Sequence, residues 1–94
     1  RGHDTFVKLA AKTLNSLAAW ELNLEEPAFK LTYYTQKLPG GAILWRQVDD
    51  TRDLKGKTDT TRYAIILQDY SFFTCGWITQ AEIRTELVRY FELK

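Results

Sequence analysis

The longest regular pattern of apolar and polar positions lies at the start of the chain. Between Thr5 and Glu21, apolar side chains recur at intervals of three and four residues, among them Phe6, Leu14 and Leu17. This spacing places them on one face of a helix, and the segment is rich in good helix formers. The sequence therefore predicts a helix over Thr5 to Glu21 whose apolar face is buried.

The segment that follows predicts a hairpin. Leu22 to Pro27 reads as a linker, and Phe29 to Thr35 alternates apolar and polar residues as a half-buried strand does. Leu38 to Gly41 contains a proline and two glycines, which are typical of a turn. Ala42 to Val48 is then a second strand, antiparallel to the first.

The second half of the predicted sheet follows a long polar loop, Asp49 to Thr61. Arg62 to Asp69 is a third strand, and its apolar centre indicates a central place in the sheet. Tyr70 to Ile78 is rich in aromatic residues and is predicted to be a fourth strand, or a continuation of the third after a turn.

The end of the chain predicts a second helix with a clear starting signal. Thr79 and Glu82 have the spacing of a capping box, in which each side chain accepts from the backbone amide of the other residue. Ile83, Leu87 and Phe91 then lie on one face of the helix.

These elements predict a single α+β domain over residues 1–94, in the order α-β-β-β-β-α. A long N-terminal helix packs on a curved antiparallel sheet of three or four strands, with a C-terminal helix. We expect five residues to face the first helix: Phe29, Tyr33, Ile43, Trp45 and Ile65. The opposite face, with Tyr34, Leu44 and Arg46, then needs a cover, either the C-terminal helix or another protein.

The composition narrows the class of protein. Hydrophobic residues make up 45% of the chain and charged residues 27%, which is ordinary for a soluble globular domain. The net charge of +1 gives no overall signal for nucleic acid or an anionic membrane, and no apolar run is long enough to span a bilayer. The sequence does not determine the cellular compartment, although the lone Cys75 and the lack of a signal-peptide pattern weakly favour the cytoplasm.

Candidate chemistry is sparse. His3 is the only histidine and lies in a terminal segment, and Cys75 lies in an apolar stretch that indicates a buried structural thiol. The aspartates of the polar loop lack the ligand spacing of a calcium loop. No acid, base, nucleophile and metal ligands converge in the sequence, so we expect no catalytic residues, no cofactor and no metal. A hydrolase or lyase with a pocket lined by Tyr34, Trp45 and Asp69 stays open as a less favoured alternative.

Aromatic and basic residues on the predicted strands are the best binding candidates. Tyr34, Trp45, Arg46, Arg62 and Trp77 are of the types that stack on and pair with partners. Our leading hypothesis is a non-catalytic protein-binding module that works through the sheet face or the hairpin loops, with a homodimer as one form of partner. Nucleic-acid binding by the sheet face is an alternative.

Two resemblances add further alternatives. The element order resembles that of the double-stranded RNA-binding domain and of the small Alu-domain proteins of the signal recognition particle, which implies RNA binding, although the last helix begins TQAEIRTE, without the lysines of the RNA-binding domain. The sequence Gln36-Lys37-Leu38-Pro39-Gly40 is similar to the Gln-x-Val-x-Gly loop of cystatins. That resemblance implies a cysteine-protease inhibitor that inserts Gln36, Leu38 and Gly40 into the protease cleft.

Overall fold

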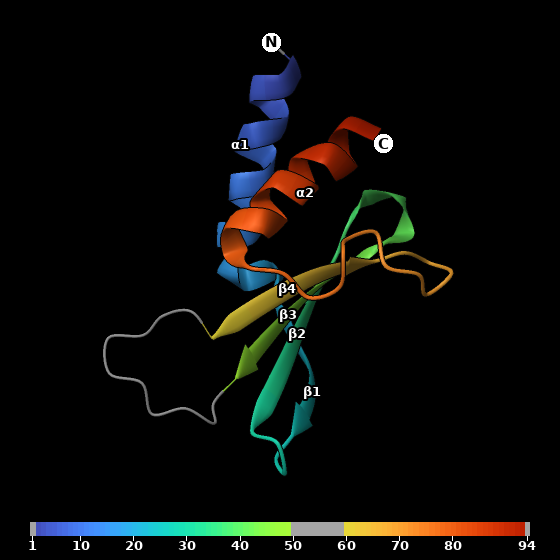
Figure 1. The fold of residues 1–94 in the computed structure, drawn as a ribbon. Helices are drawn as coiled ribbons and strands as arrows, with labels where there is room; N and C mark the ends of the chain where they lie inside the picture. The colour runs from blue at the N-terminus through green and yellow to red at the C-terminus, as the bar shows by residue number, and fades with distance from the viewer. Residues whose placement is uncertain (1, 50–59, 94) are drawn as a thin grey trace.

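The computed structural model describes residues 2–49 and 60–93, and it confirms the predicted class and element order (Figure 1). Most of the predicted polar loop, residues 50–59, lies outside the described residues. The elements are α1 (Gly2–Asn15), the 3-10 turn η1 (Leu17–Ala19), β1 (Glu21–Glu26), β2 (Leu31–Lys37), the 3-10 turn η2 (Pro39–Gly41), β3 (Ile43–Asp49), β4 (Thr61–Ile66) and α2 (Gln80–Leu93).

Helix α1 is shorter than predicted, and the predicted linker after it is a strand. The helix ends at Asn15, and the chain passes through η1 into β1. Leu22 and Leu24 alternate with polar neighbours, which is the two-residue period of a strand, and the prediction of a linker overlooked it. Pro27 lies in the tight turn that joins β1 to β2, where the Lys30 amide donates to the Pro27 carbonyl at 3.1 Å.

The four strands form an antiparallel meander in the order β1-β2-β3-β4. The predicted fourth strand, residues 70–78, is not one of them. This segment follows the outer edge of β4 and touches it through isolated bridges at Phe72 and Ile78. Tyr70 and Gly76 both have positive φ, at 71° and 70°, and this conformation interrupts extended backbone on both sides of a short stretch.

Three residues that were predicted to be buried lie at the surface. Leu17 is 77% exposed, Phe29 is 65% exposed, and Cys75 is an exposed free thiol. Each belongs to a segment whose secondary structure differs from the prediction: Leu17 to η1, Phe29 to the turn after β1, and Cys75 to the irregular segment after β4. The spacing of apolar residues predicts which side chains are buried only if the segment forms the helix or strand that this spacing assumes.

The main core lies between α2 and the sheet. Ile83, Leu87 and Tyr90 of α2 are fully buried and pack with Leu44 of β3 and Ile65 of β4, which are also fully buried. Figure 1 places both helices on the same face of the sheet, with α2 nearest to β4. Burial of side chains of this size is the largest favourable term in folding a domain of this length.

Helix α1 rests mainly on α2 and reaches the sheet near its own C-terminal end. Ala10 and Leu14 join the core cluster, and the Gln36 side-chain amide of β2 donates to the Thr13 carbonyl at 3.2 Å. The predicted packing of the first helix directly along the sheet therefore applies to α2 more than to α1. No helix in residues 2–49 and 60–93 combines the length and apolar character needed to cross a membrane.

The two faces of strands β2 and β3 are the reverse of those predicted, whereas Ile65 of β4 faces the helices as predicted. Leu44 lies opposite Ile65 in the register and both contact the helices, so alternation places Tyr33, Ile43 and Trp45 on the other face. The prediction grouped Ile65 with Trp45, whereas the register pairs it with Leu44. Alternation defines two sets of residues but does not say which set meets the helices.

The capping box of α2 is present as predicted. The Thr79 amide donates to Glu82 Oε1 at 2.9 Å, and the Glu82 amide donates to Thr79 Oγ1 at 3.3 Å. The backbone and hydroxyl hydrogen bonds from Thr79 lower the pKa of the Glu82 carboxyl below its usual range. A carboxylate whose pKa is lowered on folding stabilises the folded state above its unfolded pKa.

We therefore expect Glu82→Gln to reveal this contribution as a function of pH. The stability difference between wild type and Glu82→Gln should be greatest near neutral pH, since the unfolded pKa is about 4.3, and should vanish as the pH falls through the lowered folded pKa. Urea unfolding at a series of pH values measures it. Thr79→Ala should cost about 1 kcal/mol at neutral pH, and a pH-independent effect of Glu82→Gln would contradict the cap.

Candidate functional site

The face of the sheet that points away from the helices carries an aromatic group. The Tyr33 and Trp45 rings meet edge-on, with centroids 6.1 Å apart. Trp77 and Phe72, from the segment beside β4, extend the group. The ring centroid of Trp77 lies 5.8 Å from that of Tyr33 and 6.3 Å from that of Phe72. We call this side of the domain the aromatic face.

Polar side chains fix Tyr33 at the centre of the aromatic face. Gln47 Nε2 donates to the Tyr33 hydroxyl at 3.2 Å, and the Tyr33 hydroxyl in turn approaches Glu26 Oε1 at 3.5 Å. This chain crosses from β3 through β2 to β1, so it ties the edge strand to the central strands. A ring that is held from both sides presents a fixed surface to a partner.

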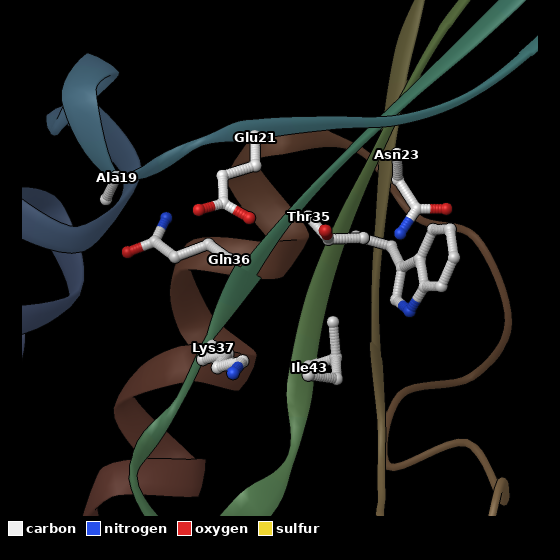
Figure 2. Close-up of a pocket in the computed structure, with 8 residues that line it drawn as sticks. Ala19, Glu21, Asn23, Thr35, Gln36, Lys37 and Ile43 are labelled. Atoms are coloured by element: carbon white, nitrogen blue, oxygen red, sulfur yellow. The ribbon is translucent and has the colours of Figure 1, made fainter.

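A first hollow lies where β1 meets the aromatic face. It has a volume of about 550 Å³, and Figure 2 shows Glu21 and Asn23 projecting from β1 to the same side, toward β2 and β3. Its other walls include Trp45 and Lys37. The full lining is Ala19, Glu21, Asn23, Thr35, Gln36, Lys37, Ile43 and Trp45. The hollow therefore combines one aromatic wall with charged and amide groups.

A second hollow of about 360 Å³ adjoins the first and shares Ile43 and Trp45 with it. Its lining is mainly apolar and consists of Gly41, Ile43, Trp45, Ile66, Leu67, Gln68 and Tyr70. Together the two hollows extend from the edge strand β1, across β3, to the turn after β4. They form one surface that is polar at the β1 end and apolar at the other.

Tyr70 stands at the rim of the second hollow in a strained turn. Tyr70 is 88% exposed and has a φ of 71°. The Tyr70 amide donates to the Leu67 carbonyl at 2.8 Å, and Asp69 Oδ1 accepts from the Ser71 hydroxyl at 2.6 Å and from the Ser71 amide at 3.1 Å. These hydrogen bonds lower the pKa of the Asp69 carboxyl. A left-handed, non-glycine residue held in place by its neighbours is the kind of strain that collects at functional sites.

The predicted site residues are divided between the two faces. Trp45, Arg62 and Trp77 belong to the aromatic face by register and ring contact. Tyr34 and Arg46 lie on the face toward the helices, where the Arg46 guanidinium is close to the Tyr34 ring. The aromatic and basic set that suggested one nucleic-acid platform is therefore not on one surface.

The hairpin loop holds its predicted contact residues inside the domain. The Gln36 amide is engaged by α1, Leu38 is 5% exposed, and the Tyr90 hydroxyl of α2 donates to the Pro39 carbonyl. Gly40 is exposed, with φ of 89°. Of the residues that resemble the cystatin loop motif, the glycine is accessible, while the Gln36 and Leu38 side chains pack inward.

Sequence reasoning missed two parts of this surface. Glu21 and Asn23 were assigned to the end of a helix and to a linker, although the alternation around Leu22 and Leu24 indicated a strand. Tyr70 was assigned to a fourth strand, or to a turn near Asp69 to Ser71 after which the third strand continues. The turn is present, but its place at the rim of the second hollow was not predicted. Among residues 2–49 and 60–93, no group of three or more histidine, cysteine, aspartate or glutamate side chains could hold a metal ion.

Comparisons of the chain with protein-family models, with curated protein sequences and with solved structures gave no match.

The backbone strain at Tyr70 can be tested by comparing the stabilities of glycine and alanine variants at this position. A left-handed conformation costs an L-residue about 1–2 kcal/mol, and glycine avoids this cost. We therefore expect Tyr70→Gly to be more stable than Tyr70→Ala by about that amount in urea unfolding. Phe72 is a matched control, because its φ is not positive, so Phe72→Gly should be less stable than Phe72→Ala. If both positions prefer alanine, the turn is not strained as described.

Proposed function

We propose that this chain is a non-catalytic protein-binding module that holds a segment of another protein across its aromatic face. The observation that carries the proposal is the pair of adjoining hollows around Ile43 and Trp45, with the exposed Tyr70 at the rim. Tyrosine and tryptophan beside a small apolar recess are typical of the centre of a protein interface.

The two hollows suit a partner with two neighbouring anchors. The mainly apolar hollow beside Tyr70 fits an aliphatic or aromatic side chain. The hollow at β1 contains the Glu21 carboxylate, which favours a lysine or arginine. In an extended peptide, side chains two residues apart point to the same side at a spacing of about 7 Å. We therefore propose an extended segment with one apolar and one basic residue on the same side.

The charge of the edge strand supports a different protein as the partner over a second copy of this chain. Strand β1 carries Glu21, Glu25 and Glu26, and in the described sheet it pairs on one side alone. Two copies joined at β1 would bring carboxylates opposite one another, which is destabilising. A basic segment would meet the same groups favourably.

The two other hypotheses receive less support from this geometry. A nucleic-acid platform would need the aromatic and basic residues on one face, and the carboxylates of β1 repel phosphate. A cystatin-like inhibitor would need the Gln36 and Leu38 side chains to be presented, and both contact the interior of the domain. Of the three hypotheses, binding of a protein segment agrees best with the residues of the aromatic face.

Selection from a displayed library of random peptides tests this proposal. We expect enriched peptides that share an apolar residue and a lysine or arginine two positions away. Chemical-shift mapping with the ¹⁵N-labelled chain should place their effects at the Trp45 indole and around Ile43. Tyr70→Gly should weaken binding about tenfold, whereas Val7→Ala, a surface change between the helices, should leave it unchanged. Enriched peptides that map to α1 or α2, or no enrichment at all, would contradict the proposal.

A further inference from the structure

On the opposite face of the sheet, Arg46 is held between two aromatic rings. Its guanidinium carbon lies 4.5 Å from the centroid of Trp20 and 4.5 Å from the centroid of Tyr34. The Trp20 indole is itself buried and fixed by a 3.4 Å hydrogen bond to the Leu14 carbonyl. A planar cation between two rings gains cation–π attraction from each, and its orientation is restricted.

The cation–π contacts give no hydrogen-bond acceptor to the Nε–H group of Arg46. The Nε atom is buried and has no hydrogen-bond partner among the residues that the structure describes. Both ring contacts are to the guanidinium carbon, and the five N–H donors of a guanidinium lie in one plane. Within residues 2–49 and 60–93, no carboxylate forms an ion pair with Arg46. A buried donor without a partner is uncommon in folded proteins, and the partner is often a bound water or ion.

A second positive charge lies near the same place. Tyr63 of β4 is opposite Arg46 of β3 in the register. The ring centroids of Tyr63 and Trp20 are 6.4 Å apart. Burial raises the pKa of the Tyr63 hydroxyl, and the charges of Arg46 and of Arg84 from α2 act in the opposite direction. The positive charges of both arginines therefore act on the same phenol.

We propose that Arg46 is the anchor of an oxyanion site, which takes a carboxylate or a phosphate group in the plane of the guanidinium. Guanidinium binds both anions through paired N–H···O bonds, and its fixed orientation between Trp20 and Tyr34 lowers the ordering cost of binding. The Arg46 residue as a whole remains partly exposed, and we expect the anion to approach the guanidinium from this exposed side. The site lies on the face opposite the two hollows and is independent of the proposed peptide site.

Nuclear magnetic resonance of the full ¹⁵N-labelled chain tests the site directly. The Arg46 Nε–H signal is assigned by scalar correlations in a ¹³C,¹⁵N-labelled sample of the wild type, and its loss in Arg46→Lys is a check. Its shift is followed during separate titrations with sodium phosphate and sodium acetate. Sodium chloride at matched ionic strength is the control. We expect a saturable shift of this signal with one or both oxyanions and none with chloride. Saturation by phosphate alone or by acetate alone identifies the preferred source of the anion.

The variants separate an anion site from a structural arginine. Arg46→Lys keeps the charge but loses the planar fork, so the saturable shift of the neighbouring Trp20 indole N–H should weaken about tenfold. Arg89→Lys is the matched control, because Arg89 already pairs with Glu86 at 2.7 Å, and it should bind as the wild type does. If Arg46→Lys does not fold, the wild-type titration decides alone. No saturable shift of the Arg46 signal, or an equal shift with chloride, would overturn the proposal.

Discussion

The contact between the apolar face of α2 and strands β3 and β4 is the interaction on which the rest of this structure depends. Ile83, Leu87 and Tyr90 are fully buried against Leu44 and Ile65. The Tyr90 hydroxyl also donates to the Pro39 carbonyl, so the same helix fixes the β2–β3 hairpin. Helix α1 joins this arrangement by packing on α2, and it contributes a smaller share of the buried surface.

One consequence is that helices cover only one face of the described sheet. Both helices lie on the side of Leu44 and Ile65 (Figure 1), and the opposite side is covered by its own aromatic residues and by the short segment beside β4. Because the aromatic face is built on central strands that α2 holds in place, its rings and hollows are fixed without a helix over them. The covered edge at β4 and the carboxylates on β1 also limit pairing between copies of the chain.

The fold could be predicted from the sequence where local signals and burial agreed. The capping box at Thr79 and the periodicity of Ile83 and Leu87 predicted α2 correctly, because a helix start and a buried face occur together there. The predicted end of α1 was wrong and β1 was taken for a linker, since the apolar spacing through Leu17 continues past the end of the helix. Nothing in the local pattern reports that the chain turns after Asn15.

The site was harder to predict, for a reason of geometry. Trp45 was identified as a binding residue, but its face depended on which set of alternating residues meets α2, and this is a tertiary property. The hollows combine residues of β1, β3 and the turn at Tyr70, which are distant in the sequence. Arg46 was also identified, but its position between Trp20 and Tyr34 requires the chain after α1 to return across the sheet.

The most direct test of the central contact is the stability of Leu87→Ala compared with Leu24→Ala. Leu87 is fully buried between α2 and the sheet, whereas Leu24 lies exposed on the edge strand. In urea unfolding we expect Leu87→Ala to lose about 2–5 kcal/mol, as large-to-small changes in a packed core do, and Leu24→Ala to lose less than about 1 kcal/mol. Equal losses for the two variants would show that α2 does not hold the sheet in this way.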